Sequence, residues 1–419
     1  MESHEGRSFP SWVVFDNYIH RKDSASFRDG DGEAPSARSI ASNGDPVLAS
    51  FRLVAPPGAS RLYLHYWREA EAFGGGTALV ALSAPSPPRT PGPSGLSLAG
   101  PLPPCYVDGR RMAGRGHAER SHMLESRDIG LLRRGEDEFA VADLKVLIPG
   151  DDDSTPVEAE LFRYRSSAVG SRQWEAKRIL IRRREGTGRG LRWWTTDKVV
   201  AFEGCLCWID YYRGILFCDA LDEDPVLRYV ELPVAPPEGN PHHPEFGRPH
   251  PFVTRSVCVT DGGGTMRFVN VSRADGGIAS RRRPGSGFTM TAWSLVMPLN
   301  SERLGWAMDG AIESDKLWMR DSYAKLRLPL LSPEFPFVSL REPDVVYAVL
   351  SERNCADGKT WMLVIDMRRR ALRSAVPYNE VEDLDLGEDV EDVEMASSSI
   401  YNNSPVLPSL FSMYLNAGT

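Results

Sequence analysis

The residues best suited to chemistry in this 419-residue sequence lie close together, between Trp208 and Gly214 (WIDYYRG). An aspartate and an arginine around a tight turn can pair with each other, and a tryptophan beside them can cover the strand above. Two interpretations are open. Trp208, Asp210, Tyr211 and Arg213 either lie at a rim and contact a partner, or they fix a hairpin, with Asp210 as hydrogen-bond acceptor and Trp208 in the core. We favour the hairpin and keep the four as candidate binding residues.

Other reactive side chains form no recognisable site. The sequence contains no P-loop, no GxSxG and no HExxH. Cys205 and Cys207 are one residue closer than the CxxC pairs that bind zinc or work in redox reactions. His242 and His243 are adjacent in a proline-bounded loop, where their side chains point apart. The sequence therefore predicts no catalytic residue, no metal site and no cofactor, and it favours a protein that is not an enzyme.

The charge of the chain is concentrated in one segment. The net charge of −8 comes from 49 Lys and Arg against 57 Asp and Glu. Residues 380–394 hold nine acidic side chains and no basic one. The rest of the chain therefore has 49 basic and 57 − 9 = 48 acidic residues, a net charge of +1. A nearly neutral body lacks the positive field of a nucleic-acid-binding protein. A content of 42% hydrophobic residues excludes an acidic disordered chain.

Two segments are not expected to join the core of the single domain that we predict over residues 9–419. Residues 84–104 contain eight prolines, and we predict a flexible insertion, rich in proline, glycine and arginine, over residues 84–124. Residues 380–398 are predicted to form an acidic flexible loop. Because its acids alternate with valine and leucine, the alternative is a tether for a basic partner.

The remaining sequence consists of short apolar runs separated by turn residues. Four such runs lie between residues 197 and 233, divided by Glu203-Gly204, Arg213-Gly214 and Asp222–Pro225. The inner runs are apolar at nearly every position, as in strands that are covered on both faces. Comparable groups of about four runs recur every 40 to 50 residues or so, which is the size of a propeller blade. They occupy residues 12–82, 129–181, 255–312 and 337–377.

This spacing predicts an all-β fold that resembles a β-propeller of about six or seven blades. Two β-sandwich domains are the alternative, because they have similar strands without a closed ring. Residues 314–323 are predicted to form a short helix. Residues 408–415 are predicted to form either a short helix or a strand that closes the ring.

The order of these segments resembles a plant family, expanded in grasses, that is catalogued as domain of unknown function 1618. The resemblance covers SWVVFDNYI at residues 11–19, ASFRLVAPPGASRLYLHYW at 49–67 and, as its most specific part, DKVVAFEGCLCWIDYYRGILFCD at 197–219. It implies no activity. Members of that family look like the propeller part of plant F-box-associated proteins, which present substrates to ubiquitin ligases. No F-box-like helical segment is recognisable near the N-terminus of this sequence.

We therefore expect a non-enzymatic, intracellular β scaffold that binds a protein or a peptide, in the cytoplasm, the nucleus or both. No signal peptide follows the polar start MESHEGRSFP, and no apolar run reaches the roughly 18 residues of a membrane helix. A membrane or nucleic-acid partner is not expected. Two alternatives stay open: a propeller enzyme with an unrecognised site at the channel mouth, and a substrate receptor joined to a ubiquitin ligase through another subunit.

Overall fold

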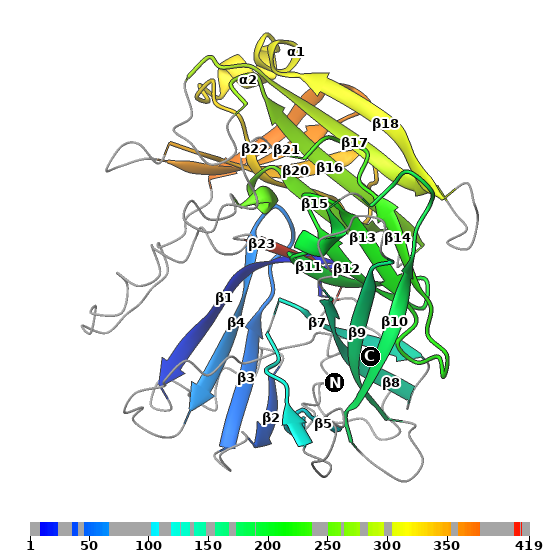
Figure 1. Cartoon of the computed structure of the whole chain (residues 1–419). Helices are drawn as coiled ribbons and strands as arrows, with labels where there is room; N and C mark the ends of the chain where they lie inside the picture. The colour runs from blue at the N-terminus through cyan, green and yellow to red at the C-terminus, as the bar shows by residue number, and fades with distance from the viewer. Residues whose placement is uncertain are drawn as a thin grey trace.

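The structure is a computed structural model of the chain (Figure 1). It describes residues 9–23, 36–40, 46–66, 102–108, 119–125, 127–134, 138–147, 156–166, 173–188, 190–236, 250–260, 264–276, 284–296, 304–352, 359–377, 406–410 and 412. The acidic segment 380–398 and the pair His242 and His243 lie outside the described residues, and so do residues 84–101.

The described chain is almost entirely β-structure, as predicted. The first sheet has the order β2-β3-β4-β1-β23, formed by β1 (Val13–Asp23), β2 (Ser36–Ile40), β3 (Pro46–Arg52), β4 (Ala59–Tyr66) and β23 (Val406–Ser409). A short pair joins β5 (Tyr106–Asp108) to β6 (Glu119–Ser121).

The other sheets are antiparallel meanders of four strands, and two of these meanders join into one eight-stranded sheet. The eight-stranded sheet consists of β7 (Ile129–Arg134), β8 (Glu138–Val146), β9 (Glu158–Arg165), β10 (Glu175–Arg182), β11 (Lys198–Phe202), β12 (Cys205–Asp210), β13 (Gly214–Cys218) and β14 (Leu227–Glu231). The next meander consists of β15 (Arg255–Thr260), β16 (Thr265–Arg273), β17 (Phe288–Val296) and β18 (Gly305–Glu313). The last consists of β19 (Glu334–Val338), β20 (Val345–Ser351), β21 (Thr360–Asp366) and β22 (Ala371–Pro377).

Helices are short and lie between strands. The predicted helix over residues 314–323 is present as α1 (Ser314–Trp318) and α2 (Asp321–Lys325), which connect β18 to β19. Two 3₁₀ turns, η2 (Leu191–Trp193) and η3 (Pro251–Val253), precede β11 and β15. None of the helices in the described part of the chain has the length and hydropathy of a membrane-spanning segment.

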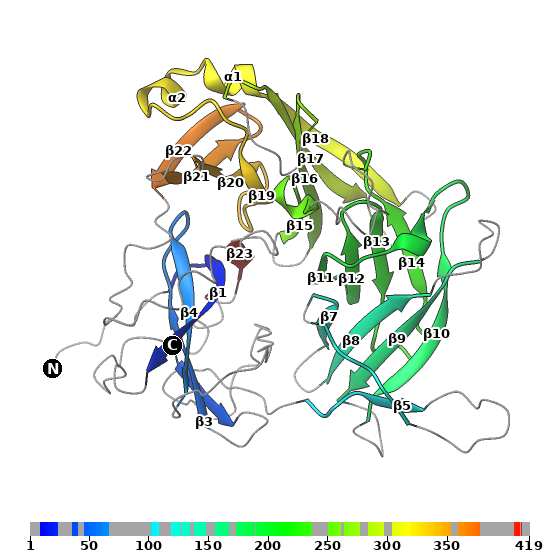
Figure 2. The ribbon, with the colours of Figure 1, turned by 60° about the vertical axis from the view of Figure 1, so that its left-hand side comes forward.

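The hydrophobic cores lie between groups of strands that are consecutive in the sequence. One core fills the space between β7–β10 and β11–β14, and a second lies between β11–β14 and β15–β18. A third joins β15–β18 and β19–β22 to β1 and β23. The groups therefore follow one another around the molecule in chain order, as Figure 2 shows from the blue first sheet through green to orange. Cores between facing sheets are a feature of propeller blades and of β-sandwiches alike.

The eight-stranded sheet is nearly closed on itself. Parallel pairing of β10 with β14 joins its two meanders at one side. At the other side, β7 lies against β11 and β12. A methyl group on Gly130 of β7 would stand 2.6 Å from a Val199 methyl and 2.7 Å from a Leu206 methyl, so glycine permits this close approach.

Strands β12 and β13 explain the continuous apolar runs in the sequence. Leu206 and Trp208 point into the core shared with β7–β10, whereas Cys207 and Ile209 point into the core shared with β15–β18. Both faces of these strands are therefore buried, as the sequence predicted. The predicted turn between β11 and β12 is also confirmed. Glu203 and Gly204 both have positive φ, 48° and 72°, as a two-residue type I′ hairpin turn requires.

Two predictions about the chain ends and the repeats are refined. Val406–Ser409 of β23 pairs antiparallel with β1, so the strand alternative for the C-terminal segment is confirmed for Pro408 and Ser409. The described residues hold five groups of four or five strands. They therefore do not account for the six or seven repeats that the spacing predicted.

The structure describes residues 102–108 and 119–124 of the predicted insertion, and these residues pack against the β7–β10 meander. Within residues 84–124, strands β5 and β6 pair, and Cys105 and Val107 are buried. Trp174 donates a hydrogen bond from its indole N–H to the carbonyl of Pro103 at 2.9 Å. Buried apolar side chains and this hydrogen bond attach the segment to the outer face of the β7–β10 meander. Proline content alone did not reveal these contacts.

A buried aspartate at the end of β21 predicts a pH effect on stability. Burial alone would raise the pKa of Asp366, but hydrogen bonds from the Arg369 N–H and the Arg373 guanidinium outweigh it and hold the pKa below 3.8. A group with a lowered pKa stabilises the fold above its unfolded pKa and loses this effect as the pH falls. Asp366→Asn is expected to lower the free energy of unfolding by about 1.5 kcal/mol at pH 7.

The same substitution is expected to cost less as the pH falls below about 4, because wild-type Asp366 then becomes protonated as well. Urea unfolding of both proteins across this range measures the difference. A cost that did not change with pH would contradict the assignment.

Candidate functional site

The four residues that the sequence singled out are all buried. Trp208 and Asp210 have no exposed surface, and Tyr211 and Arg213 retain only a few per cent. A rim position for these side chains is therefore wrong, because a partner that approached the described surface would not reach them. The hairpin interpretation describes their positions.

Asp210 and Arg213 form a buried ion pair across the turn between β12 and β13. The Arg213 guanidinium donates to Asp210 Oδ2 at 2.9 Å and, through Nε, to the carbonyl of Gly190 at 2.7 Å. Asp210 also accepts the N–H of Thr195 at 3.0 Å and the N–H of Tyr212 at 2.8 Å. The pair thus attaches the segment that precedes β11 to this hairpin.

Trp208 and Tyr211 extend the same attachments to neighbouring meanders. The indole N–H of Trp208 donates to the carbonyl of Asp128, just before β7, at 2.9 Å. The Tyr211 hydroxyl accepts the N–H of Val257 in β15 at 3.0 Å, and burial raises the pKa of this phenol. The four residues therefore connect three groups of strands, which is a larger structural role than the hairpin predicted from the sequence.

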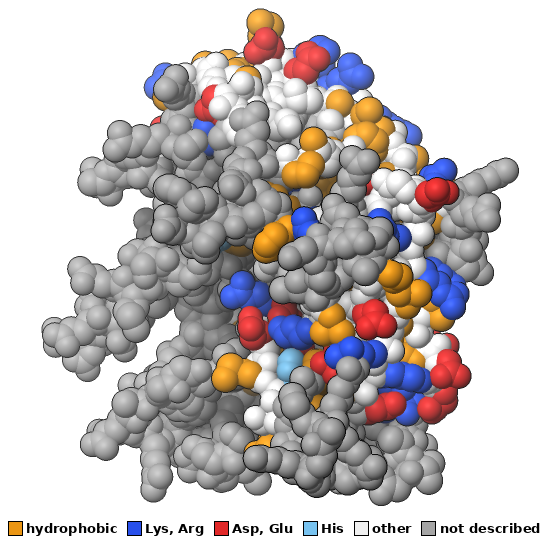
Figure 3. Space-filling view, viewed as in Figure 1, with side chains coloured by type: hydrophobic (Ala, Val, Ile, Leu, Met, Phe, Trp, Pro, Cys, Tyr) orange, Lys and Arg blue, Asp and Glu red, His pale blue; other side chains and the backbone are white. Residues whose placement is uncertain are grey.

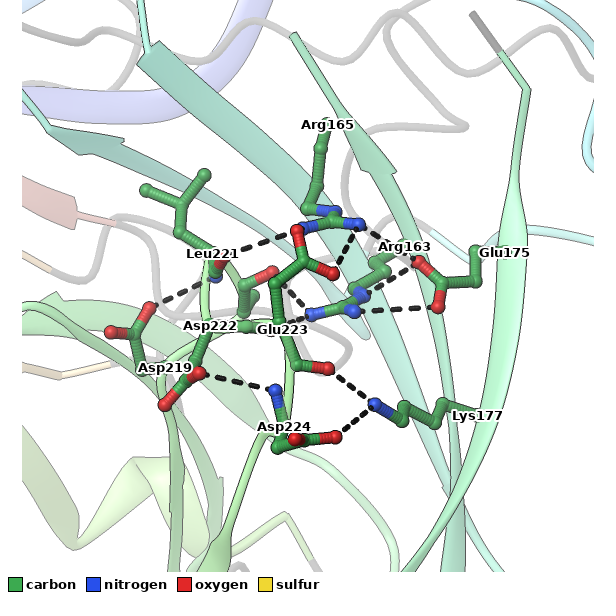
Figure 4. Close-up of polar contacts among 10 residues, drawn as sticks. Arg163, Arg165, Glu175, Lys177, Asp219, Leu221, Asp222, Glu223 and Asp224 are labelled. Atoms are coloured by element: carbon green, nitrogen blue, oxygen red, sulfur yellow. Dashed lines mark hydrogen bonds and ion pairs between the residues drawn. The ribbon is translucent and has the colours of Figure 1, made fainter. Parts of the chain in front are cut away.

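A second polar network lies where β9 ends and β10 begins, and it attaches the loop between β13 and β14 (Figure 4). Arg163 is fully buried and donates twice to the carboxylate of Glu175, at 3.1 and 3.3 Å. It also donates to the carbonyls of Ala220, at 3.1 Å, and Asp222. Because each charge here has a partner, we assign the network to the attachment of the loop rather than to ligand binding.

The cysteines show no sign of reactivity. All five described cysteines are free thiols, and none of the described His, Cys, Asp and Glu side chains form a cluster of three or more that could hold a metal ion. Burial raises the pKa of Cys205 to about 11 and that of Cys218 to about 12. A raised pKa keeps a thiol protonated and unreactive at neutral pH.

The structure brings together four ionisable residues that the sequence analysis missed: His122, Asp128, Asp143 and Lys145, here called the ionisable cluster. His122 follows β6 and donates from Nε2 to Asp143 Oδ2 at 2.6 Å. Its ring stacks on Phe162, with 3.7 Å between the ring centroids. Lys145, two residues after Asp143 on β8, donates to Asp128 Oδ2 and stands 3.9 Å from Asp143 Oδ1.

Burial and charge act in opposite directions within the cluster. Burial raises the pKa of Asp128, and the hydrogen bond from Lys145 offsets this only in part. Burial alone would lower the pKa of Lys145, but the hydrogen bond to Asp128 and the charge of Asp143 outweigh it, so this pKa is raised. Asp143 is completely buried, and its Oδ1 has no hydrogen-bond partner among the described residues.

The cluster can bind polar groups and exchange protons, since histidine, carboxylate and lysine are the usual general acids and bases. No hydroxyl or thiol of a described residue is hydrogen-bonded to His122, so the described residues form no nucleophile–histidine–acid triad. Burial, and to a lesser extent the charge of Arg127, lowers the pKa of the His250 ring.

The sequence contained one signal for this cluster. Asp143 and Lys145 interrupt the apolar run FAVADLKVLI of residues 139–148, and a charged residue in a buried strand needs a partner. Those partners could not be found from spacing. His122 fell in the predicted insertion, and Asp128 fell in the turn before β7.

Comparison with known proteins gives a family match for part of the chain. Residues 208–347 match the model of a family described as a protein of unknown function, DUF1618. The matched segment begins at Trp208 and ends in β20, so it includes the buried residues that connect the strand groups. The match supports a domain of unknown function and supplies no activity.

Other comparisons add little. No curated protein matches the chain. One solved structure with some likeness is Zg3597, a family 117 glycoside hydrolase from the marine bacterium Zobellia galactanivorans. It is 10% identical, with 84% of this chain and 89% of that chain covered, at a TM-score of 0.23. A likeness at that score carries no argument about this protein.

Proposed function

We propose that this chain is a non-enzymatic β scaffold that binds a protein or a peptide. The observation that supports the proposal is an exposed set of residues at the β5–β6 pair, here called the hairpin surface: Tyr106, Met123, Glu125 and Arg127. Tyrosine, methionine and arginine are among the residue types enriched in protein interfaces, whereas glutamate is depleted there.

The hairpin surface lies beside residues that are buried against the β7–β10 meander. Tyr106 is exposed between buried Cys105 and Val107, so it points away from the core. It pairs across the strands with Ser121, which is also exposed, and Met123 lies two residues further along the same segment. Glu125 and Arg127 form an ion pair at 3.7 Å beside them. Exposed apolar and charged groups beside a pair of strands suit recognition of another protein.

Photo-crosslinking tests this proposal at two matched methionines. Met123 is 83% exposed on the hairpin surface, and Met319 is 84% exposed between α1 and α2, far from it along the chain. A photoreactive amino acid at position 123 is expected to capture one reproducible protein from plant extract, whereas the same residue at position 319 is not. The resemblance of the sequence to a plant family determines the choice of extract.

Tyr106→Ala is expected to weaken the captured complex about tenfold or more, which is about 1.4 kcal/mol. Equal capture at positions 123 and 319, or capture that does not change in Tyr106→Ala, would show that the hairpin surface is not the interface.

A further inference from the structure

Strand β10 ends in a run of three exposed arginines, Arg182, Arg183 and Arg184. No ion pair joins any of these side chains to a carboxylate of a described residue, and this includes Glu185, which follows the run and is also exposed. Arg183 donates instead to the carbonyl of Thr187. Because a cluster of charges of one sign attracts ions of the other sign, the run favours an anionic partner.

Pairing of β10 with β14 places a further arginine beside this run. Arg182 lies next to Arg228 in the register of the two parallel strands, as Ile181 lies next to Leu227. Ile181 and Leu227 both point into the core shared by β7–β10 and β11–β14, so the two arginines lie on the opposite face. No carboxylate among the described residues forms an ion pair with Arg228. Like charges on neighbouring strands destabilise a sheet, and a bound anion would offset this repulsion.

Exposed apolar side chains lie among these arginines. Leu180 precedes Arg182 by two residues on the same face of β10 and is 49% exposed. Trp193 of η2 is 46% exposed, and the guanidinium of Arg192 stands 5.7 Å from the centroid of its ring. Figure 3 shows hydrophobic side chains next to Lys or Arg side chains over β10 and β14. Tryptophan and arginine are among the residue types that most often dominate binding at protein interfaces.

A glycine brings η2 next to the arginine run. A Cβ atom on Gly188 would stand 2.9 Å from Cδ of Arg183 and 2.9 Å from Cδ1 of Leu191, the first residue of η2. Both side chains therefore contact the same glycine, and Trp193, two residues after Leu191, lies near the arginine run. We define the arginine surface by its exposed and half-exposed residues: Leu180, Arg182, Arg183, Arg184, Trp193 and Arg228.

We propose that the arginine surface binds residues 380–394 of this chain. This segment holds nine acidic side chains and no basic one, interleaved with three valines and two leucines. Guanidinium groups bind carboxylates through paired, charge-assisted hydrogen bonds, and Leu180 and Trp193 offer apolar surface to the valines and leucines. A nucleic acid would supply phosphates but no aliphatic side chain, so the mixed character of the surface favours the peptide.

A second run of three arginines, at residues 368–370, differs from the first in its counterions. Arg368 lies 3.6 Å from Asp344, and Arg369 lies 3.9 Å from Asp366. Both arginine side chains are well exposed, at 82% and 80%, so exposure does not distinguish the two runs. A run that already has carboxylates beside it attracts an acidic peptide less strongly, because their negative charge opposes that of the peptide. Residues 368–370 therefore provide a matched control.

Photo-crosslinking in the purified full chain tests this inference. A photoreactive phenylalanine at position 193 keeps an aromatic ring on the surface, and it is expected to crosslink to residues 380–394, which mass spectrometry of the digested product identifies. The same residue at position 319, where Met319 is 84% exposed, is not expected to do so. A product of one chain or of two chains supports the assignment equally, and its mass shows whether the segment comes from the same molecule or a second copy.

The crosslinking yield is also expected to fall with salt. Raising the ionic strength from about 0.01 M to about 1 M shortens the Debye length from about 30 Å to about 3 Å, which screens exposed charges from one another. A yield that did not change with salt would contradict binding through the arginines.

Two double variants serve as test and matched control. Arg182→Glu/Arg184→Glu is expected to lower the crosslinking yield at position 193 about tenfold or more, because it replaces attraction by repulsion. Arg368→Glu/Arg370→Glu reverses the same number of exposed charges and is expected to leave the yield unchanged. Arg184→Glu alone, after the end of β10, is the second variant if the first does not fold by circular dichroism. Failure to capture residues 380–394 at position 193, equal capture at position 319, or equal losses in the two double variants would overturn the assignment.

Discussion

Asp210→Ala is expected to lower the free energy of unfolding by about 3–5 kcal/mol, the usual cost of removing one member of a buried ion pair. The substitution leaves the buried guanidinium of Arg213 without its carboxylate at 2.9 Å. It also removes the acceptor of two backbone N–H groups, those of Thr195 and Tyr212. Equilibrium unfolding in urea measures the loss.

A second substitution separates the charge from the hydrogen bonds. The double variant Asp210→Ala/Arg213→Met removes both charges. Its loss of unfolding free energy is expected to be smaller, by about 1 kcal/mol or more, than the sum of the losses in the two single variants. Asp224→Ala is the control. Asp224 is 98% exposed and pairs with Lys177 at the surface, so its loss is expected to change stability by about 0.5 kcal/mol or less. A cost below about 1 kcal/mol for Asp210→Ala would mean that the pair is not a support of the fold.

Gly214→Ala is expected to destabilise the protein by about 3 kcal/mol or more, at the upper end of what overpacking a core costs. Gly214 begins β13, opposite Glu231 of β14. A Cβ atom there would stand 2.2 Å from the carbonyl oxygen of Val230 and 2.5 Å from Cε2 of Tyr229. The carbonyl belongs to the backbone of a paired strand, so it cannot move aside as the end of a flexible side chain can.

Gly310→Ala is the matched control, because Gly310 also lies in a strand and a Cβ atom there would meet nothing within 4 Å. Its expected effect is a change of about 1 kcal/mol or less, in the stabilising direction, since alanine reduces the entropy of the unfolded chain. Thermal unfolding of the two variants beside the wild type measures both effects. Similar melting temperatures for the two alanine variants would contradict the assigned role of Gly214.

The sequence by itself determined the strands of this protein. Most predicted apolar runs coincide with strands to within a few residues, for example Arg255–Thr260, Val345–Ser351 and Ala371–Pro377. Strand formation depends on local alternation and on turn residues such as Glu203-Gly204, and both can be read along the chain. Burial on both faces of β12 and β13 followed from their continuous apolar composition.

Only the tertiary structure decided which residues meet. Sequence reasoning placed Asp210 and Arg213 together, because they are three residues apart, but their bonds to Thr195 and Gly190 depend on how the chain returns before β11. The ionisable cluster depends on the attachment of β6 and the turn before β7 to β8. Its members span residues 122 to 145, a stretch whose first residues looked like a proline-rich insertion. Local patterns fix the strands, whereas contacts between different elements fix the cluster.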